Sequence, residues 1–162
     1  MIARPIFVGV AQSAVATGEA VLATVGVGSC VAILLHDAEA AGAGLAHVLL
    51  PAPHGEPDAS TPAKYATTAV PHLLREMEAR GALRSRVTAR LVGGASMFGA
   101  LRTPTMAGAG ERNVIAAREA LAREGIPVTG EEVGRAHGRA VRLYAADGRV
   151  RVTSYRHPDV DL

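Results

Sequence analysis

The sequence predicts a single α/β domain over residues 1–162, layered around a mixed β-sandwich. Three observations indicate this class. The length suits one domain. Hydrophobic residues make up 49% of the chain, enough for a globular core. Apolar strand-like runs come in a group at the start and another at the end, without the strict alternation with helices that a doubly wound parallel sheet requires.

The first half of the chain reads as four strands followed by a helix. Short apolar and β-branched runs predict strands over residues 5–10, 21–25, 31–35 and 42–50. The proline-rich stretch that follows predicts a loop up to Pro62. Apolar residues then recur at helical spacing between positions 64 and 80, and Pro71 predicts either a kink or a helix that starts near Val70. The residues of that apolar face are Ala66, Ala69, Val70, Leu73, Leu74 and Met77.

The second half adds a strand, a helix and a closing group of strands, for about eight strands and two helices in all. Asp147-Gly148 predicts a hairpin between the two strands before the C-terminus. Residues 153–162 are expected to form a flexible tail. The expected elements are strands over 87–92, 126–133, 139–144 and 149–155, a helix over 111–124 and a glycine-bounded loop over 93–99.

The composition argues against several classes of function. Aromatic residues make up 3% and the formal net charge is +2 with the arginines scattered, so neither base stacking nor a basic nucleic-acid stripe is expected. No apolar segment approaches the length of a membrane span, and the N-terminus has no signal-peptide pattern. One cysteine excludes an internal disulfide and a cysteine-rich zinc site. A cytoplasmic protein without membrane insertion is the expectation.

The lone cysteine, Cys30, ends a glycine-rich turn, and His47 follows in an otherwise apolar strand. A thiol with an imidazole in reach can perform nucleophilic catalysis at a carbonyl, and the imidazole is expected to hold the thiol pKa below its free value of about 8.5. The turn residues Gly28 and Ser29 could offer backbone N–H groups to a developing oxyanion. Thr24 could orient the imidazole through its hydroxyl.

Ordinary structural roles compete with each of these assignments. A free cysteine is often a small buried apolar residue, a histidine in an apolar strand is often a core residue, and Thr24 is a common strand residue. A metal site built on His36, Asp37, His47 and His54 lacks any recognised ligand spacing. We therefore expect no metal and no organic cofactor.

The loop after residue 92 carries two glycines and then an apolar tip. A phosphate-binding loop is disfavoured because the Walker lysine and the three-glycine spacing are missing. Ser96, Met97 and Phe98 are expected instead to contact a partner or substrate, because exposed Met and Phe at a loop tip favour a protein partner.

Several segments, in this order, resemble the chemoreceptor glutamine deamidase family, CheD. The resemblance runs from about Phe7 to Val152, and Arg135-Ala136-His137-Gly138 departs from it, since family members often carry a Gly-Gly-Asn type turn there. The segments that carry it are Thr24-Val25-Gly26-Val27-Gly28-Ser29-Cys30-Val31, Gly44-Leu45-Ala46-His47-Val48-Leu49-Leu50-Pro51, Lys64-Tyr65-Ala66, Gly93-Gly94-Ala95-Ser96-Met97-Phe98, Glu111-Arg112-Asn113-Val114 and Gly125-Ile126-Pro127-Val128.

The resemblance implies a catalytic set of Cys30, His47 and Thr24. It implies hydrolysis of selected glutamine side chains on the cytoplasmic domains of methyl-accepting chemoreceptors, with glutamate and ammonia as products. It also implies a fold similar to the cytotoxic necrotising factor catalytic domain and a possible partner in the CheC phosphatase. Two alternatives stay open, a non-catalytic docking module that regulates CheC and a small-molecule thiol amidase.

Overall fold

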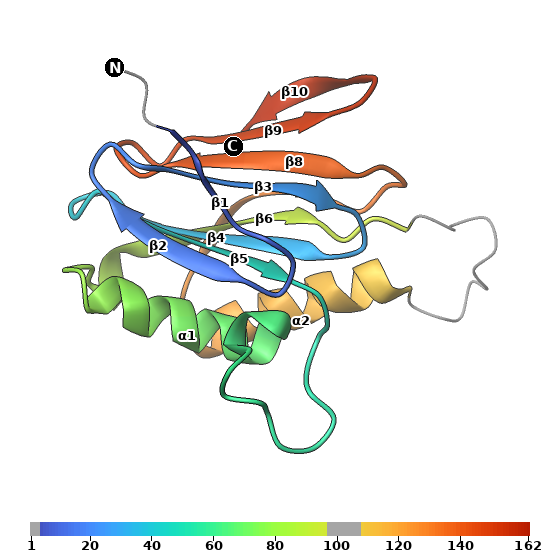
Figure 1. The fold of residues 1–162 in the computed structure, drawn as a ribbon, viewed down its shortest axis with the longest axis horizontal. Coiled ribbons are helices and arrows are strands. Elements are labelled where there is room, and N and C mark those ends of the chain that lie inside the picture. Colours follow the sequence, from blue (N-terminus) through green and yellow to red (C-terminus); the bar gives the residue numbers. More distant parts are fainter. Residues whose placement is uncertain (1–3, 97–107) are drawn as a thin grey trace.

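The computed structural model describes residues 4–96 and 108–162, which form two five-stranded sheets packed face to face with two helices on one side (Figure 1). The outer sheet has the order β1-β3-β8-β9-β10, and the middle sheet has the order β2-β5-β4-β6-β7. The outer sheet comprises β1 (Ile6–Phe7), β3 (Val21–Val27), β8 (Arg139–Tyr144), β9 (Val150–Ser154) and β10 (His157–Asp161). The middle sheet comprises β2 (Ser13–Thr17), β5 (Gly42–Val48), β4 (Val31–Asp37), β6 (Val87–Gly93) and β7 (Val128–Val133).

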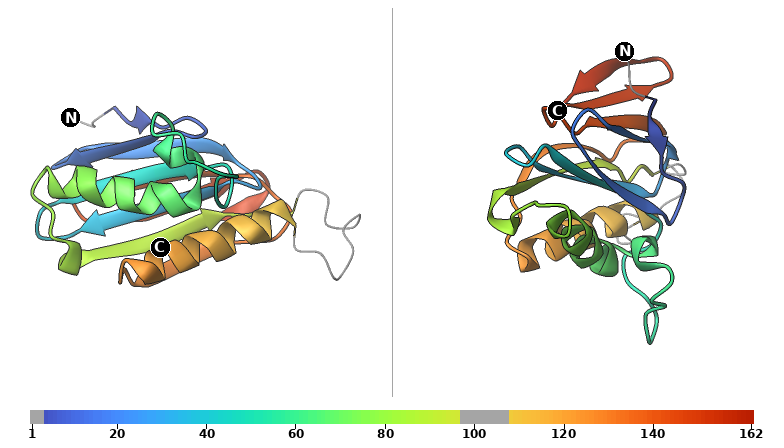
Figure 2. Two further views of the ribbon diagram at one scale, coloured as in Figure 1. Left: turned by 90° about the horizontal axis from the view of Figure 1, so that it is seen from below. Right: turned by 60° about the vertical axis from the view of Figure 1, so that its left-hand side comes forward.

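Helices α1 (Ala66–Glu78) and α2 (Ala109–Arg123) cover the face of the middle sheet that is turned away from the outer sheet, as Figure 2 shows from below. Short 3₁₀ turns at Pro62–Lys64 and Arg84–Arg86 precede α1 and β6. In the described part of the chain, no helix is both long and apolar enough to span a membrane. The predicted layered α/β domain around a mixed sandwich is thus confirmed.

The middle sheet is buried on both faces, which explains why its central strands read as continuous apolar runs. Successive β4 side chains point to opposite faces, so Ile33 packs against the helices while Leu34 packs between the sheets. The helix-side core also holds Leu73 of α1 and Leu121 of α2. The core between the sheets is built from Leu, Val and Ala side chains, and it includes Cys30.

Both sheets are mixed, as the grouping of strands predicts. The β1–β3 and β6–β7 pairs are parallel and the other pairs are antiparallel. The predicted hairpin joins β8 to β9, where Gly148 has φ +76° and the Arg149 N–H donates to Asp147 Oδ1 at 2.9 Å. Glycine suits that left-handed position because it has no Cβ.

Two expectations about the elements are wrong, and one strand was not expected. The expected tail over 153–162 instead contains β10, which pairs with β9. Edge strand β2 went unpredicted because its sequence, Ser-Ala-Val-Ala-Thr, is short and only partly buried. Helix α1 begins at Ala66 and continues through Pro71, so the alternative of a helix that starts near Val70 is wrong. Contacts of its apolar face with the middle sheet outweigh the single backbone hydrogen bond that proline removes.

Candidate functional site

Thr24 and His47 meet between the two sheets. Thr24 lies on β3 of the outer sheet and His47 on β5 of the middle sheet, and both side chains are buried. Thr24 Oγ1 lies 2.7 Å from His47 Nδ1 and 2.7 Å from the carbonyl oxygen of Val8. A hydroxyl has one proton, and the carbonyl can only accept it, so Nδ1 must be the donor in its own bond with Thr24. This arrangement selects the His47 tautomer whose Nε2 carries a free lone pair.

The free Nε2 of His47 is a buried base. Within the described residues it has no hydrogen-bond partner, and the residue is 0% exposed. Two backbone hydrogen bonds hold the His47 main chain in place. The Ala11 N–H donates to the His47 carbonyl at 2.8 Å, and the His47 N–H donates to Gln12 O at 3.0 Å. Burial lowers the pKa of His47, since an imidazolium would lose its hydration there. The imidazole is therefore neutral near pH 7.

Cys30 lies at the end of the turn from β3 to β4, on the same side of the middle sheet as His47. Ala32 of β4 pairs directly with His47, and Cys30 stands two residues earlier in the chain. Cys30 and Ala32 share the core between the sheets, so the thiol is a diagonal neighbour of the imidazole. No hydrogen bond joins Sγ to Nε2 in this structure. Such bonds are often long before substrate binds.

The resting thiol is neutral. Burial raises the pKa of Cys30 above its ordinary value, and the thiol's own backbone N–H lowers it by less. The expectation that the imidazole depresses this pKa is therefore wrong for the resting protein, because desolvation dominates. A neutral thiol faces a neutral imidazole, and a thiolate forms only when the proton moves to Nε2.

The glycine pair of the 93–99 loop packs against the Cys30 turn. The Gly94 N–H donates to the Cys30 carbonyl at 2.7 Å, and the Ala95 N–H donates to Gly28 O at 2.9 Å. At Gly93, φ is +116°, and an added Cβ would lie 2.4 Å from the Cys30 carbonyl oxygen. The absence of side chains at these two positions thus lets the strand approach the backbone of the cysteine.

The turn leaves two backbone donors unused. The Gly28 N–H donates to the Gly26 carbonyl at 3.1 Å, which makes it a poor oxyanion donor. In the part of the chain that the structure describes, the N–H groups of Ser29 and Cys30 donate to no backbone acceptor, and the Cys30 N–H interacts only with the sulfur of its own residue. Of the turn residues that the sequence singles out, Ser29 therefore keeps a free donor, and Cys30 adds one.

The loop predicted to contact partners is described only up to Ser96. The Ser96 N–H donates to the Arg135 carbonyl at 2.8 Å. Ser96 also lines a surface cavity of about 560 Å³ beside α2 and β7. Met97 and Phe98 lie outside the described residues. Arg135, in the segment that departs from the family pattern, has φ +58°.

Three of the residues considered as metal ligands belong to separate networks. His36 Nε2 donates to the Ala145 carbonyl at 2.7 Å. Asp37 accepts hydrogen bonds from the Leu83 N–H at 2.9 Å and from Arg86. His47 bonds Thr24, so these side chains act in folding or orientation at three different places.

Asn113 was missed as a site residue. It is a buried polar residue on the apolar face of α2, and its Nδ2 donates to the Ser29 and Leu49 carbonyls. The signal available in the sequence was its spacing, because it stands four residues before the inward-facing Ala117 of the predicted helix. A polar residue in such a stripe needs a specific partner.

A sandwich that holds a thiol on a tight turn, beside a hydroxyl-oriented imidazole with a free nitrogen, has the groups that a thiol-dependent amide hydrolase needs. Comparison with known proteins identifies the family. Residues 49–154 match the family model described as "CheD chemotactic sensory transduction". This chain belongs to the CheD family.

The relatives are similar over nearly the whole chain. A probable chemoreceptor glutamine deamidase CheD of Caldanaerobacter subterraneus subsp. tengcongensis is 40% identical over 150 residues, 93% of each chain. The probable chemoreceptor glutamine deamidase CheD 3 of Geobacter sulfurreducens is 40% identical over 156 residues, 96% of each. The corresponding CheD 2 of Geobacter metallireducens is 43% identical over 154 residues, covering 94% of this chain and 95% of that one.

Proposed function

We propose that this chain is a chemoreceptor glutamine deamidase, which hydrolyses glutamine side chains of chemoreceptors to glutamate and ammonia. The names of the relatives supply the substrate class. The observation that carries the chemistry is the Thr24–His47 hydrogen bond of 2.7 Å. It fixes the tautomer and leaves Nε2 as an unpaired, buried base on the face that Cys30 shares.

Cys30 is the nucleophile in the proposed mechanism. His47 Nε2 takes the thiol proton, and the sulfur attacks Cδ of the glutamine to form a tetrahedral intermediate. The imidazolium gives its proton to the nitrogen as the C–N bond breaks, so ammonia leaves and a thioester remains. A water molecule, deprotonated by the same Nε2, attacks the thioester. The C–S bond then breaks, glutamate departs and the sulfur regains its proton.

The orienting group in this set is neutral. Thr24 fixes the tautomer and direction of the imidazole, as the third member of a triad does, but it stabilises imidazolium less than a carboxylate would. The lowered pKa of His47 agrees with this, because no negative charge offsets the burial. The N–H groups of Ser29 and Cys30 stabilise the oxyanion of the tetrahedral intermediate through hydrogen bonds.

The proposal places the protein in the cytoplasm, where the receptor segments that it would modify lie. The CheC phosphatase is kept as a proposed partner, on the family resemblance alone. The docking module and the small-molecule amidase predict different outcomes in the experiment below, since neither modifies a receptor.

Mass spectrometry of a chemoreceptor cytoplasmic fragment tests the proposal. Each deamidation adds about one mass unit, and peptide mapping locates the glutamine. Wild-type protein should raise the mass, whereas Cys30→Ala should leave it unchanged while keeping the fold. A fragment that stays unmodified by wild-type protein would show that the proposed function is wrong. A Cys30→Ala variant with wild-type turnover would show that the nucleophile is wrongly assigned.

A further inference from the structure

Asn113 joins the two chain segments that carry the thiol and the imidazole. Its Nδ2 lies 3.0 Å from the carbonyl oxygen of Ser29, the residue before Cys30. The same nitrogen lies 3.1 Å from the carbonyl oxygen of Leu49, two residues after His47. Only this orientation of the amide fits, because the flipped one would point an oxygen at two carbonyl oxygens. Asn113 is 1% exposed, so water does not compete for these bonds.

Holding the Ser29 carbonyl also determines where the next N–H points. The Ser29–Cys30 peptide bond is trans, so its C=O and N–H groups point in opposite directions. Asn113 reaches the carbonyl from α2, on the helix side of the middle sheet. The Cys30 N–H therefore points to the other side, where the thiol packs between the sheets and His47 bonds Thr24 of the outer sheet. Its proximity to the sulfur agrees with this, because the N–H lowers the pKa of the thiol against the larger effect of burial.

We propose that Asn113 is a positioning residue of the reaction, which holds the Ser29–Cys30 peptide so that the Cys30 N–H serves as an oxyanion donor. Its second bond, to the Leu49 carbonyl, keeps this peptide in register with the strand of His47. The inference rests on the proposed function for its natural substrate. The positioning role also applies to any acyl compound that Cys30 attacks, so it can be tested without the receptor substrate.

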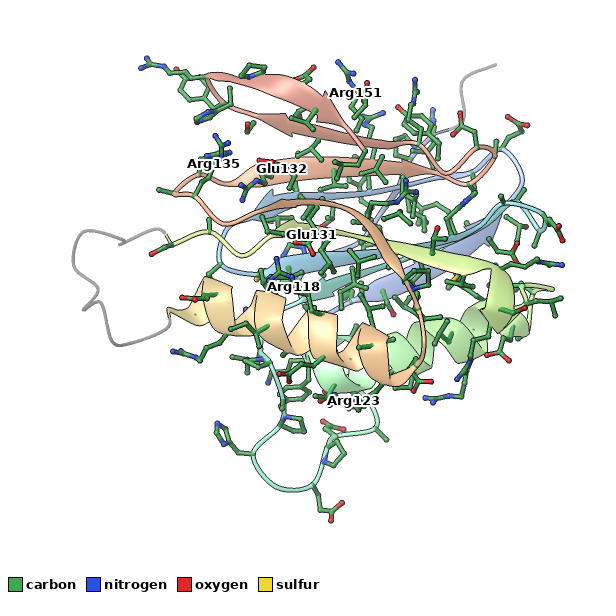
Figure 3. All side chains as sticks on the ribbon, turned by 180° about the vertical axis from the view of Figure 1, so that it is seen from behind. Arg118, Arg123, Glu131, Glu132, Arg135 and Arg151 are labelled. Atoms are coloured by element: carbon green, nitrogen blue, oxygen red, sulfur yellow. The ribbon has the colours of Figure 1, made fainter. Side chains whose placement is uncertain are left out.

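Helix α2 is a rigid support for such a group. In Figure 3, Arg118 of α2 and Glu131 of β7 point toward one another, and Arg118 Nε donates to Glu131 Oε1 at 3.0 Å. One turn before Asn113, Gly110 packs so closely on the 93–96 segment that an added Cβ would lie 2.4 Å from the Ala95 carbonyl oxygen. The helix is thus anchored to the middle sheet on both sides of the amide.

Two reactions of Cys30 separate positioning from general support of the fold. Acylation by p-nitrophenyl acetate passes through an oxyanion and releases p-nitrophenolate, whereas alkylation by iodoacetamide displaces iodide at a saturated carbon and forms no oxyanion. Asn113→Ala and the isosteric Asn113→Asp are compared with wild type in both reactions and in receptor deamidation. The matched control is Ala120→Gly, a buried position on the same helix whose substitution lowers helix propensity and removes one buried methyl group.

Both Asn113 variants should acylate about a hundredfold more slowly than wild type, the loss typical of a misaimed oxyanion donor. Their deamidation kcat should fall in parallel with KM little changed, and their alkylation rate per folded molecule should stay near that of wild type. Ala120→Gly should keep all three rates.

Equal losses in acylation and alkylation, or no loss in either, would overturn the inference. So would failure of both Asn113 variants to fold, since the residue would then be a structural one. If wild type leaves receptor glutamines unmodified while the variants still lose acylation selectively, the proposed function fails and the positioning role stands.

Discussion

Replacing Thr24 with valine removes the group that selects the tautomer of His47. Valine keeps the branched shape and the strand preference, so the backbone of β3 should be unchanged. The lost hydroxyl donates to Val8 O at 2.7 Å and accepts from His47 Nδ1 at 2.7 Å. Both partners lie in buried residues, with exposed fractions of 4% for Val8 and 0% for His47. The substitution therefore leaves one buried acceptor and one buried donor unpaired.

The cost is worked from those two groups. An unpaired buried polar group costs about 1–3 kcal/mol, so the two groups left by Thr24→Val should lower the free energy of unfolding by about 2–6 kcal/mol. The barrier to deamidation should rise by about 1–3 kcal/mol, since the imidazole is free to rotate or to carry its proton on Nε2. That is a loss of roughly tenfold to a hundredfold in rate. Thr24→Ser returns the hydroxyl and should recover much of both.

The assay is the deamidation rate of a receptor fragment at a temperature where every variant is folded, paired with urea unfolding. Thr153→Val is the matched control, because Thr153 lies on β9 of the same sheet with an exposed side chain. Its stability should stay within about 0.5 kcal/mol of wild type. A Thr24→Val protein with wild-type turnover would refute the reasoning, and the catalytic set would shrink to Cys30 and His47.

Four other outcomes follow from the geometry. Burial lowers the pKa of His47 below 6.5, so the imidazole stays neutral to a lower pH than a free histidine does. In the pH profile of kcat/KM, the loss of activity in acid should therefore have its midpoint below pH 6.5, and a midpoint at or above that value contradicts this. Alkylation of Cys30 by iodoacetamide should rise with pH around a pKa above the free-thiol value of about 8.5, and a lower one would show an ion pair. Gly93→Ala should abolish turnover and lower Tm, whereas Gly18→Ala, also at positive φ but with open space around it, should cost only about 1–2 kcal/mol. Asp37→Ala should cost at least about 3 kcal/mol in urea unfolding, because the N–H groups of Glu39, Ala40 and Leu83 lose their buried acceptor; a loss under about 1 kcal/mol would show that these bonds add nothing.

Patterns within a few residues of one another predicted most of the fold. The apolar runs of β4 and β5 and the helical spacing that ends at Met77 depend on side-chain order alone, and the structure has these elements. Local patterns failed where distant partners decide. Strand β10 forms because β9 offers it a paired edge, with Asp161 opposite Arg151. Pro71 stays within α1 because the helix packs on the middle sheet.

The sequence by itself determined the chemical inventory of the site. It contains one thiol, on a glycine-rich turn, and an imidazole in an apolar strand, and the motifs around Cys30, His47 and Thr24 resemble a known family. Residue identity and spacing along the chain carry that information without any three-dimensional contact. The sequence also restricted the turn, because glycine marks backbone positions that other residues avoid.

Only the tertiary structure decided the protonation state and the support of the site. Thr24 and His47 lie on different sheets, so their hydrogen bond exists only once the sandwich closes. Burial then raises the pKa of Cys30 and lowers that of His47, which gives a neutral resting pair. Asn113 reaches the turn from a helix 84 residues away in sequence. Desolvation and long-range hydrogen bonds depend on which segments meet in space, and local sequence patterns do not encode that.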